Sequence, residues 1–383
     1  MNNLTVSIMG WYGNRNAGDE AVLAGILQHV RKISPLATIN VFSNRPEETS
    51  QLHKVNGLYE LPSSLWQALK TPYFWGFRRA YLPGIKVLRK TDLCIIGGGG
   101  IIADHNPQLI DAWCRKIKIA LSTSKKVCLY GIGVEPLIYK SSVRKITNLF
   151  NRLDLITVRD NESKQILLDA GIENVVVAAD PAFSLVQDTT LDASDIDLGF
   201  KNNVVLCPVH RFKDEDEKKY GLMHREFVSE LAKKHPEIKV SVGLMFPKDS
   251  FITNYIKDIS NFDKEIKLFD QHPNKIVKMF SQANAIVSTR LHGGILGALA
   301  QVPICPIVYD IKVMSFAKLL KLEDCVAEFG DGITWSKKQN SGLHLFDCYE
   351  KSISKGANHY QCHLNELISK SLQQANELEK ITQ

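Results

Sequence analysis

Residues 4–33, LTVSIMGWYGNRNAGDEAVLAGILQHVRKI, hold a strand pattern, a turn and a helix pattern in one continuous run. The run starts with an apolar segment rich in β-forming residues and passes through a turn rich in glycine and asparagine. Apolar residues at helical spacing follow and are predicted to face a sheet: Val22, Leu23, Ile26, Leu27, Val30 and Ile33. A strand, a glycine turn and an amphipathic helix in this order form the first half of a βαβ unit.

The same alternation continues along the chain and predicts parallel sheets. In the first half, strands are predicted at residues 4–9, 38–42, 92–96, 127–132, 155–158 and 175–178, and helices at 19–33 and 162–170. An aspartate-rich stretch without periodicity, residues 186–203, is the candidate linker. In the second half, strands are predicted at 204–207, 239–244, 285–288 and 303–308, and helices at 223–234, 273–282, 291–301 and 313–320.

Length and spacing together predict three regions. At 383 residues and 44% hydrophobic content, the chain exceeds the roughly 100 to 200 residues that one core organises. We expect an α/β domain over residues 1–188, a second over 200–345, and a helical tail over 346–383. The tail has apolar residues at helical spacing and could pack on either domain.

Composition excludes several classes of protein. The net charge of +6 is modest and no run of Lys and Arg is long enough to follow a phosphate backbone, so no nucleic-acid partner is expected. Residues 1–10 lack a signal-peptide pattern, and no apolar run approaches the ~20 residues that span a bilayer. We therefore expect a cytoplasmic protein.

The eight cysteines are scattered without close pairs and are predicted to be buried thiols. His359, Cys362 and His363 lie together without a second pair of ligands, so no metal site is expected.

Glycine-rich loops follow two of the predicted strands of the first half. In open parallel sheets, ligands bind beyond the carboxyl ends of the strands. The candidate ligand-binding residues here are Gly10, Gly13, Asn16, Asp19 and Glu20 after the first strand, and Gly98, Gly99 and Asp104 after the strand at 92–96. Asp19 and Glu20 could also serve only to complement a helix dipole.

Cationic residues follow several other strands. They are Arg159, Arg211, Arg290, His292 and Lys312, and a helix is predicted to open at Leu291 beside two of them. Arginine forks and helix N-termini bind carboxylates and phosphates, so we expect a small, multiply anionic substrate. Two alternatives stay open: Arg159 could form a surface ion pair with Asp160, and Arg211 could lie in a solvated loop with the charged run 213–219.

Six segments taken in order resemble the polysaccharide pyruvyl transferases: residues 10–21, 92–100, 157–160 (Thr-Val-Arg-Asp), 179–183 (Ala-Asp-Pro-Ala-Phe), 289–292 (Thr-Arg-Leu-His) and 309–312 (Tyr-Asp-Ile-Lys). The resemblance runs from residue 4 to about 322. It implies two Rossmann-like domains facing across a cleft, similar to GT-B glycosyltransferases.

The family resemblance implies phosphoenolpyruvate (PEP) as donor and a glycan acceptor, without a further cofactor. The product would be a pyruvate ketal on a sugar of a cell-surface polysaccharide or its lipid-linked precursor, with phosphate released. The resemblance places the donor on the second domain at Arg290, Leu291, His292 and Arg211, with Lys312 and Arg159 completing an anion cradle.

His292 is our first choice for proton transfer, because imidazole changes charge near neutral pH. Asp19, Glu20 or Asp104 on the first domain would deprotonate or orient the acceptor hydroxyls. The main rival is a GT-B glycosyltransferase that uses a nucleotide sugar, and a more distant one is a sugar-binding module without activity.

Two parts of the first half leave the acceptor and the location open. Glu135 and residues 104–106 depart from the family pattern. Residues 66–90 mix aromatic and basic side chains, which favours either peripheral association with an anionic membrane face or an ordinary connector. A homo-oligomeric state also stays open.

Overall fold

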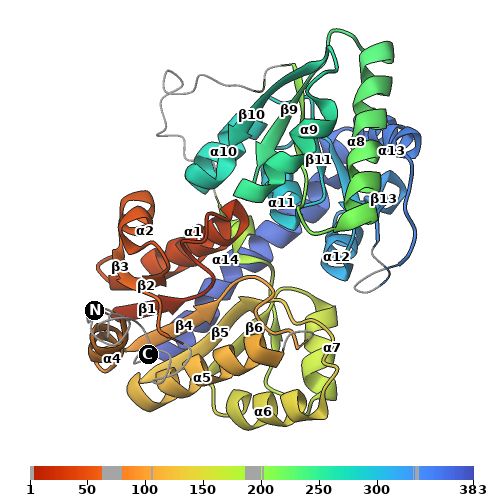
Figure 1. Cartoon of the computed structure of the whole chain (residues 1–383). Coiled ribbons are helices and arrows are strands. Elements are labelled where there is room, and N and C mark those ends of the chain that lie inside the picture. The colour runs from red at the N-terminus through yellow and green to blue at the C-terminus, as the bar shows by residue number, and fades with distance from the viewer. Residues whose placement is uncertain are drawn as a thin grey trace. The chain divides into compact units, whose positions relative to one another are not determined.

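The computed structural model describes residues 4–62, 80–104, 107–185, 200, 202–330, 332 and 336–383. The chain divides into two compact units (Figure 1). The first holds residues 1–14, 19–184 and 368–383, and the second holds residues 15–18 and 185–367.

The first unit is built on a seven-stranded sheet with the order β3-β2-β1-β4-β5-β6-β7, and all neighbouring strands pair in parallel. Its strands are β1 (Thr5–Met9), β2 (Thr38–Ser43), β3 (Asn56–Tyr59), β4 (Leu93–Gly97), β5 (Lys126–Ile132), β6 (Leu155–Val158) and β7 (Val176–Val177). The strand order reverses between β1 and β4. This topological switch point is where open α/β sheets bind ligands.

Helices connect these strands: α1 (Ala17–Ile33), α2 (Pro46–His53), α4 (Leu82–Leu88), α5 (Pro107–Thr123), α6 (Lys140–Phe150) and α7 (Asn161–Asp169). The short helix η3 (Pro181–Ser184) follows β7. Because parallel crossovers are right-handed, reversing the strand order places the connections on opposite faces of the sheet. Both faces are therefore covered, which explains the continuous burial of β4 and most of β5.

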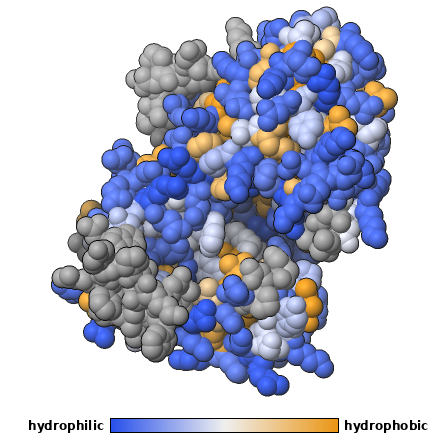
Figure 2. Space-filling model, viewed as in Figure 1, coloured by the Kyte–Doolittle hydropathy of each residue, from blue (hydrophilic) through white to orange (hydrophobic). Residues whose placement is uncertain are grey.

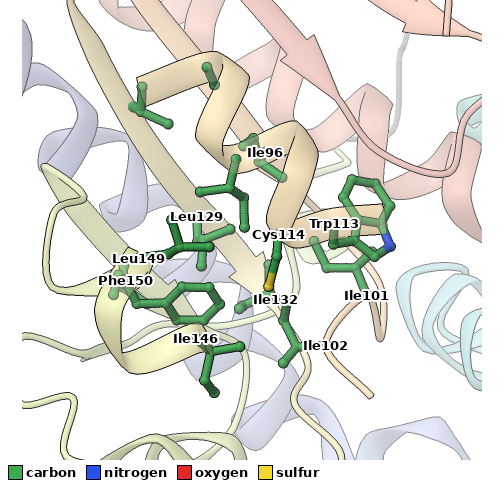
Figure 3. Close-up of a cluster of buried hydrophobic side chains, with 14 of the residues drawn as sticks. Ile96, Ile101, Ile102, Trp113, Cys114, Leu129, Ile132, Ile146, Leu149 and Phe150 are labelled. Carbon is green, nitrogen blue, oxygen red and sulfur yellow. The ribbon is translucent and has the colours of Figure 1, made fainter. Parts of the chain in front are cut away.

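A hydrophobic core fills the space between this sheet and helices α5 and α6. Figure 3 shows Ile96 and Leu129 of the sheet facing Cys114 of α5 and Phe150 of α6. Trp113 lies beside Ile101 at one side of the same cluster, and only 2% of its surface is exposed. This packing fixes the β4 and β5 ends on which the loops depend.

The second unit repeats the architecture with a six-stranded parallel sheet of order β10-β9-β8-β11-β12-β13. Its strands are β8 (Asn203–Cys207), β9 (Lys239–Leu244), β10 (Phe262–Lys267), β11 (Ala285–Ser288), β12 (Ile304–Val308) and β13 (Ala327–Glu328). The order reverses between β8 and β11. The predicted α/β class with two Rossmann-like domains is confirmed.

The helices of the second unit are α8 (Asp214–Lys234), α9 (Thr253–Ile256), α10 (Pro273–Phe280), α11 (Leu291–Leu299), α12 (Ile311–Leu319) and α13 (Gly342–Lys355). Short 3-10 helices are η5 (Pro247–Ile252), η6 (Leu268–Asp270), η7 (Glu323–Cys325) and η8 (Ala357–Tyr360). The last helix, α14 (Gln361–Thr382), groups with the second unit up to Leu367 and with the first unit from Ile368.

Several expectations need correction or fall outside the described residues. The charged run 213–219 is not a loop, because α8 begins at Asp214 and four acidic residues occupy its first turn, which suits the helix dipole. Cys362 is exposed, whereas the other seven cysteines are buried as predicted. Most of the candidate linker and residues 66–79 of the aromatic and basic segment lie outside the described residues.

The visible surface in Figure 2 is mainly hydrophilic, with apolar residues in scattered groups. None of the helices in the described part of the chain combines the length and the hydropathy needed to cross a bilayer.

The end of α14 is anchored in the first unit by polar and apolar contacts. Ser371 Oγ donates to Asp180 O at 3.2 Å, and the Gln374 side chain lies 2.5 Å from Thr157 Oγ1, which also accepts from Gly131 N. Leu378 on the same helix is fully buried. The helix therefore belongs to the core of the first unit.

Replacing Leu378 with Ala should lower the free energy of unfolding by about 2 to 5 kcal/mol, because a buried leucine leaves a cavity. The matched control is Gln373→Ala, which changes an exposed residue of the same helix. Chemical denaturation of both variants measures the difference. Equal midpoints would contradict the packing of α14 described above.

Two buried histidines should make the protein sensitive to acid. Burial lowers the pKa of His29 and of His224 to about 4, against an ordinary value of 6.5. Between these values the unfolded chain binds protons that the folded chain does not, so stability is complete near neutral pH and falls as pH drops towards 4. The loss should reach about 3 kcal/mol for each histidine.

Denaturation midpoints measured from pH 7.5 to 4.5 test this, and His29→Gln should make the dependence on pH shallower. The exposed His359 supplies the control, since His359→Gln should leave the slope unchanged. An unchanged slope for His29→Gln would contradict the assignment.

Candidate active site

In the second unit, cationic side chains follow the carboxyl ends of three strands. Arg211 follows β8, Arg290 follows β11 and caps the N-terminus of α11, and Lys312 lies in the first turn of α12 after β12. Arg290 N donates to Cys207 O at 3.2 Å, which joins the β8 and β11 ends at the switch point. The structure therefore gathers three of the predicted cations at one edge of this sheet.

A buried carboxylate holds Arg290 in place. Arg290 Nε and Nη2 donate to the two oxygens of Asp249 at 3.0 and 2.5 Å. Asp249 has no exposed surface and also accepts from the backbone N–H groups of His210 and Phe246. The four bonds tie together the loops that follow β8, β9 and β11.

The charges of this pair stabilise each other in a buried setting. Burial raises the pKa of Asp249 by more than the Arg290 charge and the hydrogen bonds lower it, so the net shift is upward. Burial lowers the pKa of Arg290, but the charge of Asp249 outweighs it and the net shift is upward. Asp249 occupies the Nε and Nη2 edge of the guanidinium, and 18% of the Arg290 side chain stays exposed.

Tyr309 places the other two cations. The Arg211 guanidinium carbon and the Lys312 ammonium each lie 5.4 Å from the centre of its ring. A cation is attracted to the face of an aromatic ring, so the buried tyrosine orders two otherwise flexible side chains. Lys312 Nζ also lies 3.2 Å from Asp310 Oδ2.

Residues 15–18 group with the second unit and bring backbone close to His292. A Cβ atom at Gly18 would lie 2.4 Å from His292 Nδ1, so only glycine fits this approach. Asn16 Oδ1 accepts from Gly18 N at 3.1 Å and thereby shapes the segment. Leu291 is buried, whereas His292 is partly exposed at the start of α11.

In the first unit, Glu20 has a structural position. Its carboxylate is buried, accepts from Gly13 N at 2.9 Å and lies 2.8 Å from His53 Nε2. These contacts hold the loop that starts at Gly10 after β1. Both Glu20 oxygens are therefore used inside the protein.

Asp19 lies beside the glycine run that follows β4. Gly98 and Gly99 have φ angles of +78° and +74°, which side-chain-bearing residues rarely adopt. A Cβ atom on Gly99 would lie 3.3 Å from Asp19 Oδ1. The structure thus brings this partly exposed carboxylate to bare backbone at the switch point of the first sheet.

Arg159 and Asp104 are held by other groups of the first unit. Arg159 pairs with Asp160 and lies 3.6 Å from Asp180, and only 9% of its side chain is exposed, so this is not the surface ion pair of the alternative. Asp104 has no exposed surface and accepts from Ile138 N and Tyr139 N at 2.8 to 3.0 Å. The second unit's cation cluster therefore does not include Arg159, and the Asp104 oxygens anchor backbone.

Two further features complete the description of the units. A groove of about 630 Å³ on the second unit, lined by Leu222, Met223 and Phe329 among others, shares no residue with the predicted site.

In the part of the chain that the structure describes, no three His, Cys, Asp or Glu side chains gather in a way that could hold a metal ion.

Sequence reasoning missed Asp249, although the same rule could have found it. The residue lies five positions after the end of β9, and the other candidates were chosen because they follow strand ends. Asp249 is a lone carboxylate in a short polar segment, and this segment does not form a recognisable motif. Its role became visible only when its four donors were in place.

Replacing Asp249 with Asn should cost about 3 kcal/mol of stability. The change leaves the buried Arg290 guanidinium without its counter-charge, and the new amide NH2 group faces groups that are themselves hydrogen-bond donors. It should also weaken the binding of inorganic phosphate, used as a probe anion, by roughly tenfold or more. Chemical denaturation and titration calorimetry measure the two effects. The control is Asp258→Asn, which breaks the exposed pair with Arg225 and should change stability much less. Wild-type phosphate affinity in Asp249→Asn would contradict this role.

Comparison with solved structures shows the same fold. UDP-GlcNAc 2-epimerase from Neisseria meningitidis, bound to UDP-GlcNAc, has a TM-score of 0.63 at 14% identity, over 98% of each chain. A putative UDP-N-acetylglucosamine 2-epimerase from Listeria monocytogenes has a TM-score of 0.60 at 11% identity, over 97% of this chain and 94% of the other. Anabaena Alr3699/HepE in complex with UDP and glucose has a TM-score of 0.57 at 11% identity, over 99% of each chain. At these identities the likeness shows the GT-B type of fold alone.

No match was found among curated proteins. Residues 16–311 match the family model described as polysaccharide pyruvyl transferase, which covers more than half of the chain. The span includes Asn16, Asp19, Arg211 and the Arg290–His292 segment, whereas Gly10, Gly13 and Lys312 lie just outside it. The chain belongs to the polysaccharide pyruvyl transferase family and is a pyruvyl transferase enzyme.

Proposed function

We propose that the protein transfers pyruvate from PEP to two hydroxyls of one sugar, forming a ketal and releasing phosphate. The observation that carries the proposal is the cation cluster of the second unit, in which Arg290, Arg211 and Lys312 follow neighbouring strands. PEP has a carboxylate and a phosphate close together. Such a ligand matches guanidinium and ammonium groups held at one edge of a sheet.

The donor site is assigned to the second unit. Asp249 fixes one edge of Arg290, which favours a single orientation of its remaining donors towards an anion. Arg211 and Lys312, both close to the Tyr309 ring, supply further positive charge. The N–H groups at the start of α11, beside Leu291, add partial positive charge from the helix dipole.

The reaction starts with protonation of the methylene carbon of PEP, for which His292 is the proposed donor. The resulting oxocarbenium-like carbon is attacked by one sugar hydroxyl, whose proton passes to a base. The bond between this carbon and the phosphate oxygen then breaks, phosphate leaves, and a second hydroxyl attacks and loses its proton to the departing phosphate. In total, two C–O bonds and one C–H bond form, and one C–O bond and the π bond of the C=C group break. Of the two hydroxyl protons, one offsets the proton that His292 gave and the other leaves with phosphate.

The acceptor is assigned to the first unit, where carboxylates lie at the switch point of the sheet. Asp19 is the proposed base or orienting group, since it is partly exposed beside Gly99. Glu20 and Asp104 use their oxygens for structural bonds, so we propose that they position the loops. Arg159, paired with Asp160 and Asp180, is likewise proposed as a positioning residue.

The proposal also includes where the reaction takes place and what it modifies. The setting is a cell membrane or the cytoplasm, the acceptor is lipid-linked, and the final product is a cell-envelope polysaccharide. The rival activity is glycosyl transfer from a nucleotide sugar. Its fold is shared, and the solved relative from Neisseria meningitidis is bound to UDP-GlcNAc. The leaving group separates the two activities.

The decisive assay incubates the protein with PEP and a panel of glycan acceptors and measures released phosphate and the mass of the glycan. The expected result is one phosphate for each glycan that gains the mass of a pyruvate ketal. Release of UDP from a UDP-sugar, without consumption of PEP, would establish the rival.

Two variants test the donor residues. His292→Ala should lower kcat by ~10²-fold or more, as expected for a lost general acid. Arg290→Lys keeps the charge but loses the fork, and should raise the KM for PEP about tenfold with a smaller effect on the acceptor. His359→Gln, an exposed change, is the control. Wild-type turnover by His292→Ala would remove this residue from the mechanism.

A further inference from the structure

The loop after β1 exposes a large aromatic side chain at the switch point of the first sheet. Trp11 has 44% of its surface exposed, whereas its neighbour Tyr12 has 1%. A single exposed apolar residue needs no special explanation when it lies on a mobile surface. Trp11 differs for two reasons: hydrogen bonds fix its backbone, and two carboxylates lie beside the neighbouring glycine run.

Hydrogen bonds hold the Trp11 loop on several sides. Tyr12 OH donates to Gly97 O at 2.7 Å, and Asn14 Nδ2 donates to Trp11 O at 3.1 Å. Arg45 Nη1 donates to Gly13 O at 2.7 Å, and Asn44 N donates to Tyr12 O at 3.1 Å. The indole therefore extends from a rigid support, which lowers the conformational entropy that a ligand must overcome.

Two carboxylates line the adjacent glycine run. A Cβ atom on Gly99 would lie 3.3 Å from Asp19 Oδ1, and one on Gly100 would lie 3.7 Å from Glu135 Oε1. Glu135 is held in turn by its backbone, since Glu135 N donates to Ile102 O at 2.9 Å. The Trp11 loop after β1 is bonded through Tyr12 to Gly97 at the end of β4, and the two carboxylates lie beside the next glycines. The ends of β1, β4 and β5 therefore combine an exposed indole, bare backbone and two carboxylates on neighbouring loops.

This combination suits a neutral sugar. A pyranose has a polar rim and apolar C–H faces, and an aromatic ring provides a flat apolar surface with a polar edge. Carboxylates accept strong hydrogen bonds from hydroxyls on the rim. The same two negative charges would repel an acidic sugar at short range.

We infer that Trp11, Asp19, Glu135 and the glycine run 97–100 form the subsite for the acceptor, with Trp11 as the stacking surface. The acceptor unit that it binds is an uncharged hexopyranose. The inference rests on the proposed function for its role in pyruvyl transfer. Binding of the sugar itself can be measured without transfer.

The binding test uses methyl β-D-galactopyranoside and methyl β-D-glucopyranoside as neutral probes and methyl β-D-glucuronide as the acidic probe. Saturation-transfer NMR and tryptophan fluorescence of the full chain report binding. At least one neutral probe should bind and perturb the fluorescence of the wild type, and Trp11→Ala should bind it about tenfold more weakly, with Trp11→Phe between the two. The control is Leu36→Ala, which removes an exposed side chain just before β2. Leu36 lies where the strands of this sheet begin, whereas Trp11 lies where they end.

Glu135→Gln tests the charge preference, because it keeps the shape and removes one negative charge. Binding of the glucuronide should improve severalfold in this variant. In transfer assays, Trp11→Ala should raise the KM for the glycan about tenfold and leave the KM for PEP unchanged.

Wild-type glycoside affinity in Trp11→Ala would overturn the stacking role, as would the absence of any probe binding to the wild type. Tighter binding of the glucuronide than of the neutral probes by the wild type would overturn the choice of an uncharged sugar. If neutral glycosides bind in a Trp11-dependent way but no glycan gains a pyruvate ketal, the sugar subsite stands and the proposed function fails.

Discussion

Parallel pairing of every strand in both sheets brings all the loops that follow strands to a single edge of each sheet. Short segments far apart in the sequence, such as those after β8, β9 and β11, therefore meet without any long loop. The crossover helices that parallel pairing requires bury both faces of the sheet and make the strand ends rigid. The positions of Arg290 in the second unit and of Trp11 in the first follow from this one constraint.

Buried carboxylates then convert the strand ends into fixed sites. Asp249 uses four donors to join three loops behind Arg290, and Glu20 joins the Gly13 backbone to His53. A buried carboxylate is costly unless its oxygens are satisfied, so each of these groups favours one loop conformation over its alternatives. Three partly exposed residues then set the local charge at the strand ends. They are Arg211 and Lys312 in the second unit and Asp19 in the first.

The inner strands of the fold were predictable because they are mainly apolar, and β6, β9 and β11 begin and end where the sequence predicts. The edge strands β3 and β10 were missed, since their exposed faces contain polar residues and their pattern resembles a loop. The start of α8 was missed because it is highly charged. The cations at strand ends were predictable from position alone. Their counter-charges were not, because the pairing of Arg290 with Asp249, or of Arg159 with Asp180, depends on loops folding together.

The six family segments have different roles in the molecule. Arg290 and His292 follow β11 at the start of α11, where we propose that the donor binds, but Thr157 and Asp180 support the end of α14, and Arg159 is paired nearby. A family match therefore tests the fold. Among the proposed acceptor contacts, Trp11 and Asp19 lie in the first segment and the glycine run 97–100 lies in the second, whereas Glu135 lies outside all six segments. Trp11 precedes the matched span 16–311. Acceptor specificity in such a chain has to be argued from the side chains around the β1 and β4 ends.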